Sequence, residues 1–316
     1  MKIIFMGTPA LAVSALELLR KEHEILAVVT QPDKPAGRGH KLSPSPVKEY
    51  SQAHDIPVLQ PERARDESFV AQLRELKPEA MAVVAYGQIL PREILEMPRE
   101  NFASGGCVNL HYSLLPRWRG AAPVQYSVWQ GDEKTGVTTQ WMVEKLDAGD
   151  IIMQREISIT PEETSGDLFE KLVPLGAGVL RETMHLMQNG IAPREPQNHD
   201  LATFCPTIKK EEARINWNQS AIEISNQIRA FNPRPAAQCE FKNAPLKIWL
   251  ARAAKDDDGS TPSTAPGSIL HSKDQVIVAT GNGALELLEV QPPGKPRMNA
   301  LDWSRGARLS EADVLE

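Results

Sequence analysis

The chain begins with the pattern of a strand, a helix and a second strand, and this alternation limits what it can fold into. The apolar run Lys2–Met6 is typical of a buried parallel strand, and Gly7 turns the chain. We expect a helix to follow, with Thr8 as its cap and Pro9 at its first position. Ile25–Thr30 is a second apolar strand. Such a βαβ unit predicts a doubly wound, mostly parallel α/β sheet.

Two further patterns extend this picture along the chain. Ala80–Tyr86 is apolar throughout, which predicts a central strand of the same sheet. From Ile215 onward the character changes to short β-rich runs separated by Pro, Gly and Asp, a pattern that predicts a small barrel. These runs are Ala237–Phe241, Lys247–Ala251, Ser268–His271, Gln275–Ala279 and Leu285–Val290.

The change of pattern suggests a division into domains. We expect an α/β catalytic domain over residues 1–189, a linker over residues 190–208 and a smaller β-barrel domain over residues 209–316. The linker is inferred from its prolines and its lack of periodicity. The acidic end of the chain, Glu311 to Glu316, is expected to be a frayed tail.

Composition excludes several classes of protein. A hydrophobic content of 41% and a charged content of 24% are ordinary for a soluble globular chain. The formal net charge is -6, so any nucleic acid must be met by local basic patches. Three widely spaced cysteines without a CxxC pair argue against a zinc site or a disulfide framework, and they fit a reducing cytoplasm. No signal peptide or membrane-spanning stretch is evident.

The segment Cys107–Pro123 combines a short strand with a loop rich in special residues. Asn109 and His111 are two positions apart, so on a strand both side chains point to the same face. An amide donor beside an acid/base group is what a developing oxyanion needs. The strand breaks at Ser113 and reaches Pro116, which puts the pair at the strand's C-terminal end. Parallel sheets bind their ligands at that edge.

These residues carry a resemblance to a known family. Asn109-Leu-His111 followed by Ser113-Leu-Leu-Pro116 resembles the signature of the 10-formyltetrahydrofolate-dependent formyltransferases. The continuation Arg117–Pro123 is similar to the branch of that family that formylates methionyl-tRNA. Further similar blocks occur in order over nearly the whole chain. They are Met6–Pro9, Thr30–Asp33, Pro35–Arg38, Val84–Gly87, Leu146–Asp150 and Lys210–Arg214.

The resemblance implies a fold, a reaction and a set of catalytic residues. The fold would be a Rossmann-like sheet followed by a barrel that resembles an OB-fold. The enzyme would transfer the formyl group of 10-formyltetrahydrofolate to the α-amino group of methionyl initiator tRNA, for translation initiation. Asp147 would complete a catalytic set with Asn109 and His111, and no metal would be needed.

The resemblance also implies two binding regions, on an enzyme that we expect to be a monomer. The folate would be bound by Gln88, Ile89, Leu90, Ser113, Leu114, Leu115 and Pro116. The tRNA would be bound by Arg38, Lys41, Lys209 and Lys210. Arg38 and Lys41 belong to the loop from Gln31 to Pro46, whose length favours a functional over a purely solvated role.

Three local features stay open at this stage. Tyr112 stands where the family usually has a small residue, and it either narrows the pocket or points away. Arg234 stands where the family usually has an aromatic residue. Arg117 and Arg119 flank Trp118, and they serve either surface packing or contact with the tRNA end or the folate glutamate.

Three alternative functions also remain. One is a formyltransferase acting on a small amine such as an amino-sugar nucleotide, which the Arg38 loop and the barrel disfavour. Another is a formyltetrahydrofolate hydrolase, which typically has a regulatory domain that we do not find. The last is a non-catalytic tRNA-binding protein, and the co-occurrence of Asn109, His111 and Asp147 argues against it.

Overall fold

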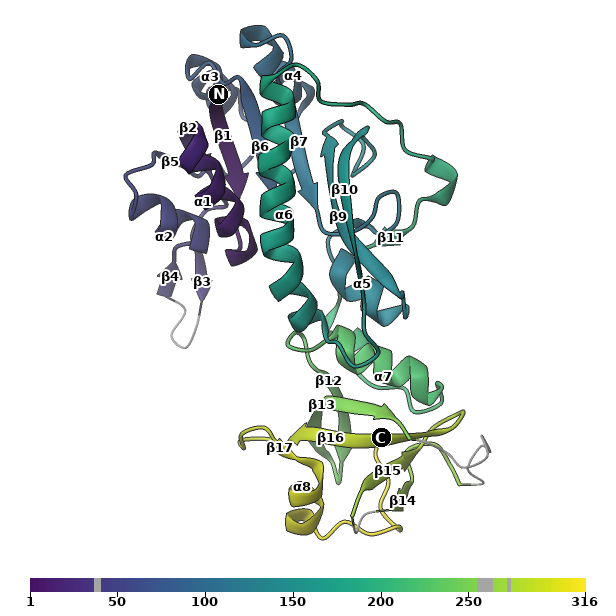
Figure 1. Cartoon of the computed structure of the whole chain (residues 1–316). Coiled ribbons are helices and arrows are strands. Elements are labelled where there is room, and N and C mark those ends of the chain that lie inside the picture. The colour runs from purple at the N-terminus through teal and green to yellow at the C-terminus, as the bar shows by residue number, and fades with distance from the viewer. Residues whose placement is uncertain (37–40, 255–263, 272–273) are drawn as a thin grey trace. The chain divides into compact units, whose positions relative to one another are not determined.

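A computed structural model describes residues 1–36, 41–254, 264–271 and 274–316 of the chain (Figure 1). The described residues form two compact units. The first consists of Met1–Pro123, Thr135–Ile157 and Phe169–Cys205, and the second of Val124–Lys134, Ser158–Leu168 and Pro206–Glu316. Among the described helices, none is both long enough and apolar enough to cross a lipid bilayer.

A seven-stranded sheet forms the centre of the first unit, in the order β10-β9-β7-β6-β1-β2-β5 (Figure 1). The five strands from β7 to β5 pair in parallel, and β9 runs antiparallel to β7. The βαβ start and the central place of β6 are confirmed. The strands are β1 (Lys2–Gly7), β2 (Glu24–Val29), β5 (Val58–Leu59), β6 (Ala80–Val84), β7 (Gly106–His111), β9 (Lys134–Trp141) and β10 (Ile151–Ser158).

Helices cover both faces of this sheet, and the side chains of each strand point to the two faces in turn. On one face, alternate strand residues such as Met6 and Met81 pack against helices α3 (Glu67–Glu75) and α4 (Arg92–Asn101). On the other, Gly176 of α6 (Ser165–Gln188) lies against Leu110. The first unit also contains α1 (Val13–Glu22) and α2 (Pro46–Gln52), whereas α5 (Pro123–Trp129) lies almost wholly in the second.

Three local expectations for this unit were incomplete or wrong. Thr8 caps no helix; its hydroxyl donates to the carbonyl of Tyr86 and accepts from the amide of Gln31. The helix α4 was not foreseen, because Pro98 within it argues against a helix. The segment after Gln31 is not only a loop: β3 (Lys34–Ala36) and β4 (Lys41–Ser43) pair antiparallel within it.

The second unit contains an antiparallel sheet curled into a half-barrel, in the order β12-β13-β16-β15-β14 with β17 beside β16. Its core includes Ile224 and Ile228 from the helix α7 (Ala221–Ala230). The predicted fold class, a mostly parallel α/β sheet followed by a small β-barrel, is therefore confirmed. The other elements are β12 (Ala237–Phe241), β13 (Ala244–Ala253), β14 (Ile269–His271), β15 (Val276–Ala279), β16 (Ala284–Gln291), β17 (Met298–Asn299) and α8 (Ala300–Ala307).

The C-terminal segment bridges the two edges of this half-barrel. Leu315 pairs antiparallel with Phe241 at the end of β12, and Val314 pairs antiparallel with Ser268 beside β14. The side chain of Leu315 is buried in the barrel core. The expectation of a frayed tail was wrong, because the apolar pair Val314 and Leu315 outweighs the acidic residues around it.

Candidate active site

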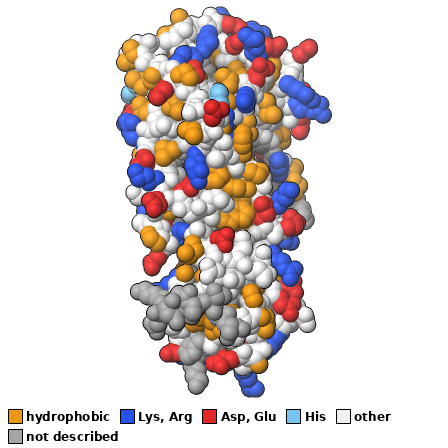
Figure 2. Space-filling model, turned by 90° about the vertical axis from the view of Figure 1, so that its right-hand side faces the viewer, with side chains coloured by type: hydrophobic (Ala, Val, Ile, Leu, Met, Phe, Trp, Pro, Cys, Tyr) orange, Lys and Arg blue, Asp and Glu red, His pale blue; other side chains and the backbone are white. Residues whose placement is uncertain are grey.

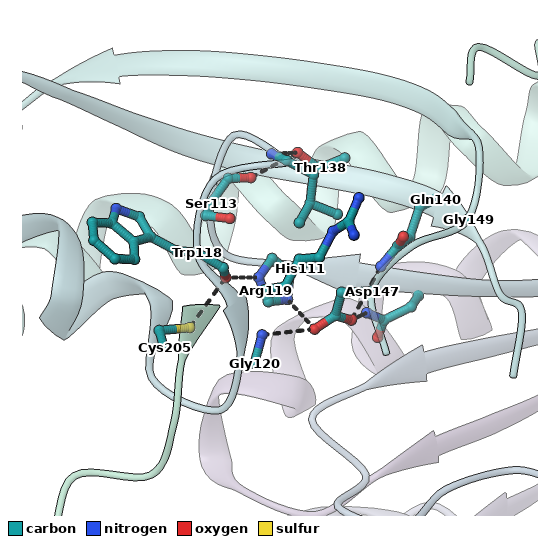
Figure 3. Close-up of polar contacts among 12 residues, drawn as sticks. His111, Ser113, Trp118, Arg119, Gly120, Thr138, Gln140, Asp147, Gly149 and Cys205 are labelled. Atoms are coloured by element: carbon teal, nitrogen blue, oxygen red, sulfur yellow. Dashed lines mark hydrogen bonds and ion pairs between the residues drawn. The ribbon is translucent and has the colours of Figure 1, made fainter. Parts of the chain in front are cut away.

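The side chains of Asn109 and His111 leave β7 on the same side and meet the carboxylate of Asp147. Figure 3 shows His111 and Asp147 turned toward one another. The amide Nδ2 of Asn109 donates to Oδ1 of Asp147 at 3.3 Å. Nδ1 of His111 lies 3.7 Å from Oδ2 of the same carboxylate. Two neighbouring side chains of β7 thus meet a carboxylate that lies 38 positions after Asn109 in the sequence.

Asp147 is held in place by further donors. The amide of Gly120 donates to Oδ2 at 2.9 Å, and Nε2 of Gln140 donates to Oδ1 at 3.1 Å (Figure 3). Gly120 adopts a φ of +129°, and a Cβ there would lie 2.5 Å from the carbonyl oxygen of Cys205. A glycine is therefore required where the backbone approaches the carboxylate so closely. Gln140 stands opposite Asn109 in the β7–β9 register.

The orientation of His111 is fixed from its other nitrogen. Nε2 lies 2.7 Å from the carbonyl oxygen of Trp118, and a carbonyl can only accept, so Nε2 carries the proton. Trp118 is fixed in turn, because its amide donates to Oγ1 of Thr203. The thiol of Cys205 donates to the same carbonyl at 3.1 Å. With Nε2 occupied in this way, Nδ1 faces the Asp147 carboxylate.

The turn after β7 is held by its own polar groups. The hydroxyl of Ser113 donates to the carbonyl of Arg117, and Oγ1 of Thr138 donates to the carbonyl of Ser113 (Figure 3). The amide of Leu115 donates to that same Oγ1. Ser113 and Leu115 are buried, whereas Leu114 and Pro116 are partly exposed. This turn sets the position of the carbonyl that orients His111.

Comparisons with known proteins agree over the whole length. The formyl transferase family matches residues 1–184, and its C-terminal domain family matches residues 207–308. Methionyl-tRNA formyltransferase from Alkaliphilus oremlandii is 44% identical over 317 aligned positions, which cover 100% of this chain and 99% of that protein. The enzyme of the same description from Moorella thermoacetica is 45% identical over 316 positions, covering 100% of this chain and 99% of the other.

This chain belongs to the methionyl-tRNA formyltransferase family. It is therefore a formyltransferase enzyme of translation initiation, from a family that uses folate formyl donors. Solved structures at low identity show the shared fold alone. The sugar 3N-formyltransferase WlaRD superposes with a TM-score of 0.66 at 19% identity, covering 94% of this chain and 99% of that one. An N-formyltransferase from Helicobacter canadensis gives 0.64 at 19%, covering 92% and 99%.

The first folate segment expected for this formyltransferase has mixed surroundings. The amide of Gln88 bonds to the backbone of Pro61 and Ala64, so it holds that segment. Ile89 is 83% exposed, and both residues line a cavity of about 510 Å³. Leu90 is buried in the core beneath α4. Two of the three neighbours therefore line one cavity, and the third belongs to the core.

Sequence reasoning missed a second cavity, which lies on the same face of the sheet as Asn109. It has a volume of about 270 Å³, and Cys107, two residues before Asn109 on β7, lines it. Leu95, Met142 and Val143 supply further apolar walls, and Leu90 belongs to the same core cluster as Leu95 and Cys107. Buried apolar positions on different elements give no local motif, so only the fold reveals them. The remaining lining residues are Arg92, Glu96, Arg99, Trp141, Glu144, Asp150 and Arg194.

The sequence also showed no sign of a buried network of hydrogen-bonded side chains next to Asp147. Gln197 donates to the carbonyls of Asp147 and Gly149 and to Oε1 of Gln140. Its own Oε1 accepts from Arg119, whose NH2 group also lies 2.9 Å from Nδ1 of His199. Arg119 is only 1% exposed, and burial lowers its pKa although Asp147 acts in the opposite sense. Arg119 is thus part of the frame of the site and is not a surface contact.

The open positions now have definite places. Arg117 is exposed and stacks over the Trp118 ring at 4.3 Å. Tyr112 points away from the site, toward Phe169 and the carbonyl of Leu11. Arg234 is exposed, and nothing in the structure explains why it replaces an aromatic residue.

The tRNA-binding candidates that the structure describes belong to two different units. Lys209 and Lys210 are exposed at the start of a 3-10 helix, Lys210–Ala213. Lys41 begins β4. Arg38 lies outside the described residues.

Proposed function

We propose that this chain transfers the formyl group of 10-formyltetrahydrofolate to the α-amino group of methionyl initiator tRNA. One observation carries this proposal: Asn109, His111 and Asp147 converge at the C-terminal end of β7. The chain that carries them aligns over its whole length with methionyl-tRNA formyltransferases. The sequence similarity supports the acceptor, and the site geometry supports the chemistry.

In this reaction the unprotonated amine attacks the formyl carbon, and the carbonyl oxygen becomes negative. Asn109 supplies an uncharged donor for that oxygen. An amide nitrogen has two N–H groups, and Asp147 accepts only one of them, at 3.3 Å. The second N–H of Asn109 then stabilises the oxyanion, while the first keeps the side chain in position.

His111 and Asp147 act as a pair in the proposed mechanism. With Nε2 donating to Trp118, a second proton on Nδ1 gives an imidazolium whose charge faces the carboxylate. Such a cation beside the oxyanion lowers the barrier electrostatically. The collapse of the intermediate breaks the bond from carbon to N10. The amine loses one proton and N10 gains one, so the protons balance.

The folate donor occupies the cavity beside Cys107 in this proposal. Leu95, Met142 and Val143 provide apolar walls for a flat heterocycle, and the charged side chains that also line the cavity supply polar groups around it. The formyl group then lies beside Asn109, further along the same face of β7. The segments Gln88–Leu90 and Ser113–Pro116 contribute by shaping the two sides of this region.

The tRNA is met by local basic groups, since the net charge is -6. We propose Arg38 and Lys41 near the acceptor end, and Lys209 and Lys210 with the barrel as a further platform. On the face drawn in Figure 2, Lys and Arg are interspersed with Asp and Glu, so binding depends on specific positions. The division into 1–189, 190–208 and 209–316, a monomeric state and a cytoplasmic location belong to the same proposal.

The decisive experiment offers one labelled formyl donor to the full chain with four acceptors. These are methionyl initiator tRNA, methionyl elongator tRNA, an amino-sugar nucleotide, and none. We expect formyl-methionyl initiator tRNA as the dominant product. Formylation of the sugar nucleotide alone would support the small-amine alternative, and formate release without any acceptor would support a hydrolase. Binding of tRNA without transfer would contradict the proposed function.

A further inference from the structure

A cluster of metal-ligating side chains lies where α1 ends beside α6. Glu22 is the last residue of α1, His23 follows it, and His185 comes from the C-terminal half of α6. One ligand atom from each of the three residues lies within 4.8 Å of the others. The His185 and His23 rings meet edge to face, with centroids 5.9 Å apart. These elements do not carry Asn109, His111 or Asp147.

The buried histidine of this cluster lacks a partner that burial would normally require. His23 is only 8% exposed, and its Nε2 has no hydrogen-bond partner among the described residues. Its Nδ1 lies 3.4 Å from the Met1 amine, so Nε2 is the nitrogen left for another ligand. An unsatisfied buried nitrogen costs free energy unless something binds it.

The charges around the cluster suit a cation that takes nitrogen and oxygen ligands. A metal binds an imidazole nitrogen that carries no proton, and the unpartnered Nε2 of His23 is available for this. Glu22 supplies an anionic oxygen, 2.7 Å from Nε2 of His185. Arg181 lies 3.8 Å from the other oxygen of Glu22 and opposes a cation there.

We infer that Glu22, His23 and His185 form a binding site for a divalent transition-metal ion, with Zn²⁺ as its best match. Two imidazoles and one carboxylate are a known ligand set for zinc, and a water molecule can complete a four-coordinate site. Bound in this way, the ion joins the end of α1 to α6 and uses the unpartnered nitrogen of His23. The site is independent of the formyl-transfer proposal.

Titration of the metal-free full chain with Co²⁺ tests this inference, because low-coordinate Co²⁺ gives visible d–d absorption bands. We expect saturable bands at one ion per chain, which added Zn²⁺ abolishes. Calorimetry with Zn²⁺ should give the same stoichiometry. Thermal unfolding should shift upward with Zn²⁺ concentration, since the ion binds only the folded state.

Two variants and a matched control make the test specific. His185 is half exposed, so His185→Ala should fold; we expect it to weaken Zn²⁺ by more than the roughly 10–100-fold typical of outer-shell changes. Glu22→Gln, which keeps the side-chain shape, should also weaken binding. His54→Ala removes an exposed histidine elsewhere and should bind as the wild type does. Absent Co²⁺ bands, or equal Zn²⁺ affinity in wild type and both variants, would overturn the inference.

Discussion

Two carboxylates of this enzyme are buried to a similar degree and make similar numbers of hydrogen bonds. The side chain of Asp147 in the first unit is 10% exposed, and that of Asp313 in the second is 14% exposed. Asp147 accepts from Asn109, Gly120 and Gln140. Asp313 accepts from the amide and hydroxyl of Ser310 and pairs with Nζ of Lys242 at 2.9 Å.

The difference lies in the cations that the two carboxylates face. Lys242 carries a permanent charge, which fixes Asp313 as an anion that stabilises the C-terminal turn. Asp147 faces His111, an imidazole whose Nδ1 lies 3.7 Å from Oδ2. Burial and hydrogen bonds therefore do not mark a catalytic carboxylate by themselves. An acid/base side chain beside the carboxylate gives the stronger indication.

The largest effect is expected at Asp147, which we propose is the catalytic carboxylate of the pair, and at its neighbour Asn109. Asp147→Asn and Asn109→Ala should each lower kcat by about two to three orders of magnitude, the usual cost of losing charge stabilisation at an oxyanion. Folate binding and the unfolding midpoint should change little. Asp147→Asn keeps a polar side chain, and Asn109→Ala removes only one long hydrogen bond. Single-turnover formylation of methionyl-tRNA measures the effect.

Asp313→Asn is the matched control for this measurement. It changes a carboxylate of similar burial and should keep the wild-type turnover. Full activity in Asp147→Asn would remove the catalytic role of that carboxylate and leave it as a turn residue.

The amount of the site that the sequence predicts depends on the range of the interactions. The shared face of Asn109 and His111 follows from a two-residue spacing, and the structure shows it. Asp147 was identified only by resemblance. Gln197 was missed because its partners lie 48 to 78 positions away, and no local pattern encodes such a contact.

The fold shows the same limit. The strand and helix patterns of the first unit were predictable, because periodicity is local. The role of Leu315 was not, since its partner Phe241 is distant in the sequence and acidic residues surround it. The sequence left Arg119 open between surface packing and contact with a substrate, and neither alternative foresaw its place in the interior, where Oε1 of Gln197 accepts from it.

The second expected effect concerns the stability of the C-terminal segment, which contains both Asp313 and Leu315. Leu315→Ala should destabilise the protein by about 2–3 kcal/mol, toward the low end for a buried leucine because the segment closes the rim of the barrel. Urea unfolding of the full chain measures it. Val314→Ala is the control, because Val314 is 45% exposed and should cost no more than about 0.5 kcal/mol. Equal losses in both variants would contradict closure of the barrel by Leu315.

The third prediction concerns positive surface charges, which we expect to contribute to tRNA binding and not to the stability of the fold. The double change Arg38→Ala and Lys41→Ala should lower kcat/KM for methionyl-tRNA and reduce its salt slope by roughly one unit per lost phosphate contact. The affinity for folate should stay the same. The test is to measure kcat/KM for methionyl-tRNA across a salt series. If the double variant gave the same dependence on salt as the wild type, the two residues would not contact tRNA.

The smallest expected effect concerns the pH dependence of Asp313. Burial alone would raise the pKa of this carboxyl, but hydrogen bonds from Lys242 and Ser310 outweigh it, and the folded-state pKa lies below the ordinary value of 3.8. A depressed folded pKa stabilises the folded state above the unfolded pKa, and this stabilisation is lost as the pH falls through the folded value. Wild type should therefore be more stable than Asp313→Asn at pH 7, and the two should converge as the pH falls below about 4. Urea midpoints measured from pH 7 down to below the folded-state pKa test this. A difference that stays constant in acid would mean that the charge of Asp313 does not stabilise the C-terminal turn.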